Sequence, residues 1–153
     1  MDVEEYIHDE VVRQKSNNFD EFRKAYEYAY SYTPENLPQG DLGRFVQEIA
    51  WYVEPDINYW CNRPTIGYTT LRVTEVGFAN GGSAAKAVDV PHQFDRLMNF
   101  WSPDFSPEDV EVWIKSLLET HPWQDGNGRT GSLLRNWLLG QMSDPEPLPY
   151  YRF

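Results

Sequence analysis

The chain has 153 residues, of which 41% are hydrophobic and 16% aromatic, so its length and composition fit one folded domain and exclude a disordered chain. Its 24 acidic and 13 basic residues give a formal net charge of -11, which excludes the basic footprint of proteins that bind nucleic acids or anionic membranes. A phosphate-bearing ligand must therefore be bound by groups gathered at one place, such as backbone amides or a metal ion.

Cysteine usage and the lack of long apolar runs narrow the class of protein further. Cys61 is the only cysteine, which excludes an internal disulfide and a cysteine zinc cluster. Residues 1–5 are acidic and lack the basic and apolar regions of a signal peptide. No apolar run approaches the ~20 residues of a membrane-spanning helix. We therefore expect a cytoplasmic protein with no membrane partner.

Two helices are predicted in the first third of the chain. Apolar residues recur at spacings of three and four over residues 19–30 and again over residues 42–53, which is typical of amphipathic helices. Asn17 or Asn18 is a suitable N-cap for the first helix, and Pro55 ends the second. Alternating tyrosines leave the end of the first helix ambiguous between helix and strand.

A β-hairpin is predicted over residues 65–90. Strand-forming residues are spread over residues 66–76, and the turn sequence Asn-Gly-Gly-Ser follows at residues 80–83. Val88 and Val90 are expected on the return strand.

Three further helices are predicted in the second half of the chain. The first runs from Pro91 to about Trp101, the second from the N-cap Ser106 to about His121, and the third contains the apolar residues of 133–138. The last ten residues contain three prolines and are expected to be irregular. Together these elements predict a mainly α fold.

Residues 121–131, His-Pro-Trp-Gln-Asp-Gly-Asn-Gly-Arg-Thr-Gly, join the last two predicted helices and carry the candidate functional groups. The backbone amides of residues 126–129 lie at the N-terminus of a helix, where unpaired N–H groups and the helix dipole favour anions. Gly126 and Gly128 let a phosphate approach the backbone closely, and Arg129 adds a forked set of positive donors.

Two further side chains of this loop supply metal and acid–base chemistry. Asp125 is a hard oxygen ligand of the kind that holds Mg²⁺ together with substrate phosphates. His121 is the nearby group whose ordinary pKa allows it to accept a proton near pH 7. A base, a metal ligand and an anion site within nine residues predict a site of phosphate transfer.

The residues alone leave three other interpretations of this loop. Residues 126–131 match the dinucleotide fingerprint G-x-G-x-x-G, but that motif requires a preceding strand, whereas a helix is predicted here. The Asp-Gly and Asn-Gly pairs are typical of hairpin turns, although no strand pattern flanks them. His121 alone would suit the C-terminal cap of a helix.

The loop closely resembles the signature of the Fic family (the Fic/Doc or Fido fold), His-x-Phe-x-Asp/Glu-Gly-Asn-Gly-Arg-x-x-Arg. The resemblance implies a single Fic-like domain, a helical bundle with a β-hairpin flap. Its core would span about residues 40–142, with an N-terminal helical extension over residues 1–39 and an irregular tail over residues 143–153. Family members typically transfer AMP from Mg·ATP to a Ser, Thr or Tyr hydroxyl of a target protein, so ATP and Mg²⁺ are the implied cofactors.

The resemblance also implies roles for individual residues. His121 would deprotonate the target hydroxyl, Asp125 would hold the metal, and Trp123 would anchor the loop in the core in place of the family's Phe. The phosphates would be bound by Gly126, Asn127, Gly128 and Arg129. The target would pair with the edge of the flap, at Leu71, Arg72, Val73 and Thr74.

One position departs from the signature. Ser132 stands where the family has a second arginine that contacts the distal phosphates, so we expect a slow enzyme with weak ATP binding. Arg135, one turn further along, is a candidate to replace the missing charge. The family's toxin branch also lacks the second arginine, which leaves a Doc-like phosphotransferase (a protein kinase toxin) as an alternative. A catalytically weak binding module with the same fold is another.

Residues 31–36 resemble the inhibitory motif Ser/Thr-x-x-x-Glu-Gly/Asn of many relatives, with Glu35 as the inhibitory residue. Prolines at positions 34 and 38 limit any helix here to about one turn. The arginine that such a glutamate pairs with is absent as well, so we do not expect Glu35 to inhibit. Besides nucleotide and a protein target, the resemblance suggests an antitoxin or another regulatory partner.

Overall fold

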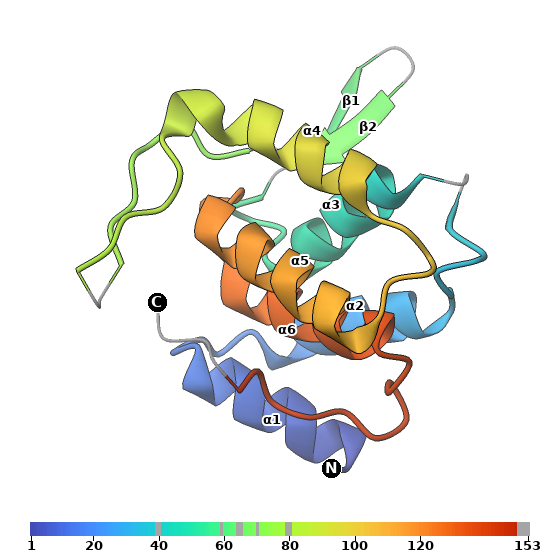
Figure 1. Cartoon of the computed structure of the whole chain (residues 1–153). Coiled ribbons are helices and arrows are strands. Elements are labelled where there is room, and N and C mark those ends of the chain that lie inside the picture. The colour runs from blue at the N-terminus through green and yellow to red at the C-terminus, as the bar shows by residue number, and fades with distance from the viewer. Residues whose placement is uncertain (39–40, 59, 64–65, 70, 79–80, 150–153) are drawn as a thin grey trace.

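The computed structural model describes residues 1–38, 41–58, 60–63, 66–69, 71–78 and 81–149. Within these ranges the fold is mainly helical, as predicted, with six α-helices and two short strands (Figure 1). The helices are α1 (Val3–Arg13), α2 (Phe19–Tyr30), α3 (Leu42–Val53), α4 (Val90–Phe100), α5 (Pro107–Thr120) and α6 (Asn127–Leu138). None of the helices in this part of the chain is long and apolar enough to cross a membrane.

Local sequence explains where several helices begin. The Ser106 hydroxyl accepts a hydrogen bond from the Asp109 amide, and the Asp109 carboxylate accepts one from the Ser106 amide, both at 3.1 Å. This capping box confirms the predicted start of α5. Asp2 and Asp41 cap α1 and α3 by accepting from backbone amides. Asn18 holds the N-cap position of α2 but makes no capping hydrogen bond.

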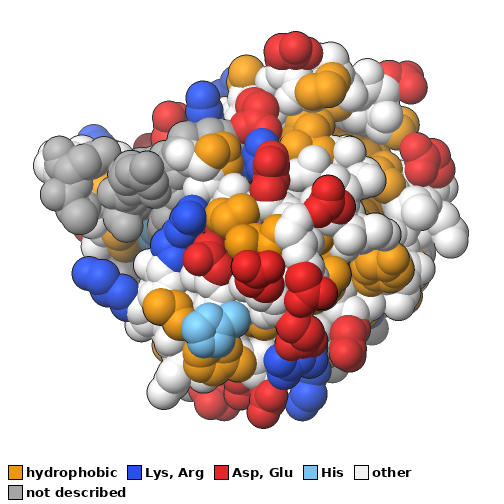
Figure 2. All heavy atoms as spheres, turned by 90° about the horizontal axis from the view of Figure 1, so that it is seen from below, with side chains coloured by type: hydrophobic (Ala, Val, Ile, Leu, Met, Phe, Trp, Pro, Cys, Tyr) orange, Lys and Arg blue, Asp and Glu red, His pale blue; other side chains and the backbone are white. Residues whose placement is uncertain are grey.

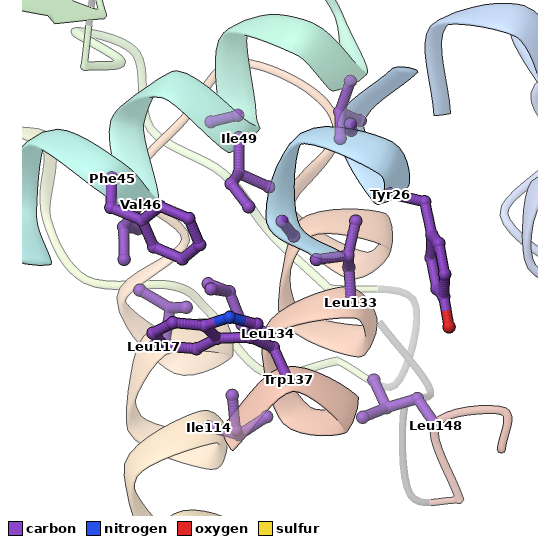
Figure 3. Close-up of a cluster of buried hydrophobic side chains, with 14 of the residues drawn as sticks. Tyr26, Phe45, Val46, Ile49, Ile114, Leu117, Leu133, Leu134, Trp137 and Leu148 are labelled. Atoms are coloured by element: carbon purple, nitrogen blue, oxygen red, sulfur yellow. The ribbon is translucent and has the colours of Figure 1, made fainter. Parts of the chain in front are cut away.

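Helix α6 is the centre of the bundle. All residues from Asn127 to Trp137 are buried, and α1, α2, α3 and α5 pack against it. Figure 3 shows its apolar side chains Leu133, Leu134 and Trp137 facing those of α3 and α5. A buried side chain of this size stabilises the fold by about 1.5–3 kcal/mol. The core therefore fixes the first turn of α6 and the loop that precedes it.

The two strands are short and form a hairpin nearer the N-terminus than the predicted one. β1 (Trp60–Arg63) pairs antiparallel with β2 (Ile66–Thr69), with Trp60 opposite Thr69. β2 therefore lies within the predicted range of residues 65–90, and β1 precedes it. Residues 71–78 form no regular strand, although an isolated bridge joins Gly77 to Ser83. The predicted turn at residues 80–83 is therefore a loop closed by one bridge, and its first residue lies outside the described part of the chain.

The predicted return strand is wrong. Val88 lies in a 3₁₀ turn, η2 (Ala87–Asp89), and Val90 is the first residue of α4. Pro91 explains the difference, because proline removes a donor from a strand ladder but is favoured in the first turn of a helix. β-branched residues alone did not decide the structure of this segment.

The acidic composition is visible on the surface. Figure 2 shows the molecule from the side on which α1 lies, and Asp and Glu side chains form a band across this face with smaller groups of Lys and Arg around it. The acidic side chains on this face repel anions. An anionic ligand therefore needs positive side chains or backbone amides gathered at one place.

Candidate active site

One pocket of about 150 Å³ brings together the loop residues that the sequence predicts as functional. Its lining consists of Gln14, His121, Asp125, Gly126, Asn127, Gly128 and Arg129. The loop residues follow α5 or begin α6, whereas Gln14 is the C-cap of α1. Figure 1 shows the C-terminal ends of α1 and α5 and the N-terminal end of α6 on the same side of the bundle.

The first turn of α6 presents backbone amides at this pocket. Gly126, with φ of 81°, is the N-cap, and no side chain caps the helix in the described part of the chain. The first helical hydrogen bond runs from Thr130 N to Gly126 O at 2.9 Å. The amides of Asn127, Gly128 and Arg129 therefore precede the intrahelical ladder, as an anion-binding turn requires.

Side chains within the loop hold this turn in position. The Asn127 amide group accepts from Trp123 N at 3.0 Å and donates to Trp123 O at 2.8 Å. Trp123 is fully buried and lies edge-on to Phe94, with ring centroids 5.9 Å apart. Trp123 thus anchors the loop, and the Asn127 side chain shapes it through hydrogen bonds to the backbone.

Substitution of Gly126 tests how closely the loop backbone packs. An alanine Cβ at this position would lie 2.9 Å from Val53 Cγ1, and the left-handed φ is itself unfavourable for alanine. We expect Gly126→Ala to lower the free energy of unfolding by about 1–2 kcal/mol for the backbone plus about 1–3 kcal/mol for overpacking.

Gly140→Ala is the matched control, because Gly140 has φ of 69° and an alanine Cβ there would meet no atom within 4 Å. It should lose only the backbone contribution of about 1–2 kcal/mol in urea unfolding. Equal losses for the two variants would contradict close packing at Gly126.

His121 ends α5 in a strained backbone conformation. Its φ of 52° and ψ of 64° are left-handed, a region in which glycine is usual. The His121 amide donates to Leu117 O at 3.0 Å, and the imidazole ring lies edge-on to Phe78 with centroids 5.5 Å apart. The Nδ1 atom of His121 is buried and has no hydrogen-bond partner among the described residues.

The surroundings of His121 favour the neutral imidazole. Burial, and then the positive charge of Arg72, lower the pKa of His121 from its ordinary value to about 4, against smaller opposing effects of the Leu118 backbone and of Asp125. The imidazole is therefore neutral at pH 7 and able to accept a proton. A base with so low a pKa binds a proton weakly near neutral pH.

Arg72 is a structural residue. Its side chain is buried, and its guanidinium donates to the carbonyls of Thr74, Ala85, Thr120 and His121. The bonds to Thr74 and Thr120 measure 2.7 Å and 2.9 Å. Arg72 therefore satisfies carbonyls at the C-terminal end of α5, where a cation also complements the helix dipole.

The other three residues of the predicted target-docking edge differ in exposure. Leu71 packs partly buried against the core, whereas Val73 is 85% exposed and Thr74 is exposed too. The segment is nevertheless fixed to the loop, because Arg72 N donates to Pro122 O at 2.9 Å and Thr74 Oγ1 donates to Gln124 Oε1 at 3.1 Å. Val73 and Thr74 are thus the members of this edge that a partner can reach.

Arg129 is buried and already paired. Its Nη2 lies 2.9 Å from Glu54 Oε1 and 3.6 Å from Asp125 Oδ1, and its Nη1 donates to Ser16 Oγ at 3.1 Å. Asn18 Nδ2 donates to the same Glu54 oxygen at 2.7 Å. Arg129 therefore lines the pocket with a positive charge that Glu54 offsets, and it joins α6 to the α1–α2 loop.

Asp125 is open to the pocket. Its side chain is 52% exposed, and its Oδ1 accepts the Gly126 amide at 2.7 Å. The Asp125 backbone carbonyl accepts from Asn58 Nδ2 at 2.9 Å, which holds the loop to the segment after α3. A single accessible carboxylate beside backbone amides suits Mg²⁺, which keeps several waters and shares its ligands with phosphates. In the described part of the chain, no cluster of three metal-ligating side chains occurs.

The structure does not bring Ser132 or Arg135 to the pocket. Ser132 is fully buried, with its hydroxyl 2.7 Å from the Tyr6 hydroxyl of α1. Arg135 pairs at 2.7 Å with Glu111 and with Glu146. Glu111 lies near the start of α5, roughly 15 Å along the helix axis from His121. Neither Ser132 nor Arg135 therefore supplies the positive charge that the signature places at the pocket.

Glu35 is also remote from the pocket. It lies exposed in a turn that Thr33 and Asn36 close, which agrees with the limit that the prolines set. The neighbouring Tyr32 carbonyl accepts from Trp137 Nε1 at 2.9 Å, near the C-terminal end of α6. That end is roughly 15 Å along the helix axis from the first turn of α6. The carboxylate that pairs with Arg129 belongs to Glu54.

Sequence reasoning missed three features of the site: Gln14, Glu54 and the structural role of Arg72. A signal for Glu54 was present, because an acidic residue is unfavourable at the C-terminal end of a helix unless it has a specific partner. Gln14 and Arg72 carried no local signal, since each reaches the site through contacts distant in sequence.

Comparisons with known proteins do not assign a function to this site. A scan against models of known protein families gives no match, and a search among curated proteins finds no match either. The function therefore has to be inferred from the residues and from their arrangement.

Proposed function

We propose that the protein is an adenylyltransferase, which transfers AMP from Mg·ATP to a Ser, Thr or Tyr hydroxyl of a target protein. The observation that supports this proposal is the single pocket that gathers His121, Asp125 and the first turn of α6. The helical bundle and the position of the loop between α5 and α6 agree with a Fido fold. A function that uses ATP also agrees with a cytoplasmic location.

The proposed reaction assigns one proton transfer to His121. The target oxygen forms a bond to the α-phosphorus, the bond from that phosphorus to the bridging oxygen of the β-phosphate breaks, and pyrophosphate leaves. The hydroxyl proton passes to His121, which is neutral at pH 7 because burial lowers its pKa to about 4. Arg72 holds the backbone of His121, and so the position of the imidazole, through its hydrogen bond to the His121 carbonyl.

The chain's other groups bind and orient the phosphates. The amides of Asn127, Gly128 and Arg129 stabilise negative charge on the phosphate that is attacked. Asp125 is the residue that would hold Mg²⁺, which when bound would offset the charge of the phosphates. These contributions need no basic surface, in agreement with the net charge of -11.

We further propose that residues 71–78 guide the target segment. Val73 and Thr74 expose this edge, and Arg72 ties it directly to the backbone of His121. An extended peptide beside this edge could bring its hydroxyl to the imidazole by main-chain hydrogen bonds. In this proposal the segment acts as the flap, although its predicted return strand is absent.

A phosphotransferase is the second candidate, and the place of Ser132 favours it. Since Ser132 faces Tyr6 and Arg135 pairs with Glu111 and Glu146, neither anchors the distal phosphates in the orientation required for AMP transfer. A nucleotide bound in the reverse orientation would place its γ-phosphate at His121 instead.

Parallel incubations of the protein with a lysate and with α-labelled or γ-labelled ATP separate the candidates. Adenylylation leaves the α label on a protein, and phosphorylation leaves only the γ label. We expect the α label, because the Gly-Asn-Gly turn of the adenylylating signature is present at residues 126–128. A protein labelled only from γ-ATP would replace adenylylation with phosphorylation, and no labelled protein would favour a binding module.

A further inference from the structure

A second hollow adjoins the pocket at His121. It has a volume of about 370 Å³, and its lining consists of Gln14, Lys15, Ser16, Asn17, Asn18, Glu54, Asp125 and Arg129. Gln14, Asp125 and Arg129 line both spaces, so the two are neighbours separated by these side chains. The α1–α2 loop forms the outer wall of the second hollow, and no motif of the sequence indicated it.

Lys15 occupies an unusual position in this wall. The amides of Lys15 and Ser16 donate to the carbonyls of Val12 and Val11 at 2.9 Å and 3.0 Å, which is the Schellman pattern at the end of α1. The residue at its left-handed position is usually glycine, yet here it is a lysine with φ of 56°. Among described residues other than glycine, only Lys15 and His121 have positive φ, and each lines one of the two spaces.

The charge of Lys15 is available to a ligand. Its side chain is exposed, and no ion pair of Lys15 occurs among the described residues. The hydrogen bond from Arg129 Nη1 to Ser16 Oγ, at 3.1 Å, ties the loop to the first turn of α6. Lys15 is therefore held beside the pocket, while Arg129 is shared between Ser16 and Glu54.

We propose that this hollow is a second anion subsite in which Lys15 binds the distal phosphates of the nucleotide. The proposal rests on the proposed function, since it assumes a nucleoside triphosphate whose α-phosphate lies at the amides of residues 127–129. Lys15 supplies from α1 the positive charge that Ser132 does not supply from α6. Mg²⁺ held by Asp125 would reduce repulsion between these phosphates and the carboxylates of Asp125 and Glu54.

Calorimetric titration of Mg·ATP and of AMP into the wild type and Lys15→Gly tests the subsite. We expect Lys15→Gly to weaken ATP binding about ten- to a hundred-fold, the usual effect of losing one charged hydrogen-bonding partner. AMP lacks the distal phosphates, so its affinity should not change. Lys15→Arg should keep ATP binding, and Lys24→Gln on the exposed face of α2 is the control for general charge.

Thermal unfolding of the same variants separates binding from folding. Glycine fits the left-handed position, so Lys15→Gly should be at least as stable as the wild type. Equal ATP affinity in the wild type and Lys15→Gly, or equal weakening of ATP and AMP, would overturn the subsite. ATP binding that depends on Lys15 without any AMP transfer would leave the subsite standing and overturn the proposed function. AMP transfer, together with unaltered ATP binding in Lys15→Gly, would overturn the subsite and leave the proposed function standing.

Discussion

Replacement of His121 by asparagine is expected to lower AMP transfer by about 10²–10⁴-fold, the usual effect of removing a general base. Asparagine tolerates the left-handed backbone that His121 adopts, with φ of 52°, better than alanine does. It cannot accept the hydroxyl proton near neutral pH, because its amide is not basic. The transfer of α label from ATP measures the loss, and calorimetry with Mg·ATP checks that binding persists.

His92→Asn is the matched control for this variant, since His92 is exposed on α4 and does not line the pocket. It should transfer AMP at the wild-type rate. Wild-type transfer by His121→Asn would contradict the role of His121 as the base. Loss of ATP binding together with transfer would show that His121 shapes the pocket.

Replacement of Arg72 by leucine is expected to destabilise the fold by at least about 3 kcal/mol. The guanidinium donates to four backbone carbonyls; the bond to Thr120 is buried and the other three bonds are partly buried. A buried carbonyl that loses its partner costs about 1–3 kcal/mol. The end of α5 and the segment after β2 would lose the guanidinium that joins them, while the backbone bond from residue 72 to Pro122 would remain. Urea unfolding followed by circular dichroism measures the difference in the free energy of unfolding.

Arg23→Leu is the comparison, because Arg23 is likewise multiply bonded, to Glu4 and Asp20, but at the surface. Surface ion pairs contribute about 0–1 kcal/mol, so this variant should change stability little. Similar losses for Arg23→Leu and Arg72→Leu would contradict the assignment of Arg72 as the tie between α5 and residues 71–78.

The helices of the second half were predictable because their signals are local. Ser106 is the N-cap as predicted, and the apolar spacing up to His121 matches the buried face of α5. The prediction of a return strand is wrong because it relied on the β propensity of Val88 and Val90. That propensity is weaker than the preference of Pro91 for the first turn of a helix.

The loop of the candidate site was predictable for the same reason. His121, Asp125 and the two glycines are close together in the sequence, so a single loop is enough to bring them to one pocket. Arg72 and Lys15 reach the loop from other elements and carried no local signal. The position of the acidic Glu54 at the end of a helix indicated that it has a partner but not which one. Nothing local indicated that Tyr6 covers Ser132, since the two residues are 126 positions apart.

The position of the α-phosphorus tests the central claim most directly. A crystal structure of His121→Asn grown with Mg²⁺ and ATP should show the triphosphate along the first turn of α6. The α-phosphate should lie nearest residue 121, and the distal phosphates should lie toward the hollow at Lys15. A nucleotide bound outside the pocket that Gly126 and Arg129 line, or one with its γ-phosphate nearest residue 121, would contradict adenylyl transfer at this site.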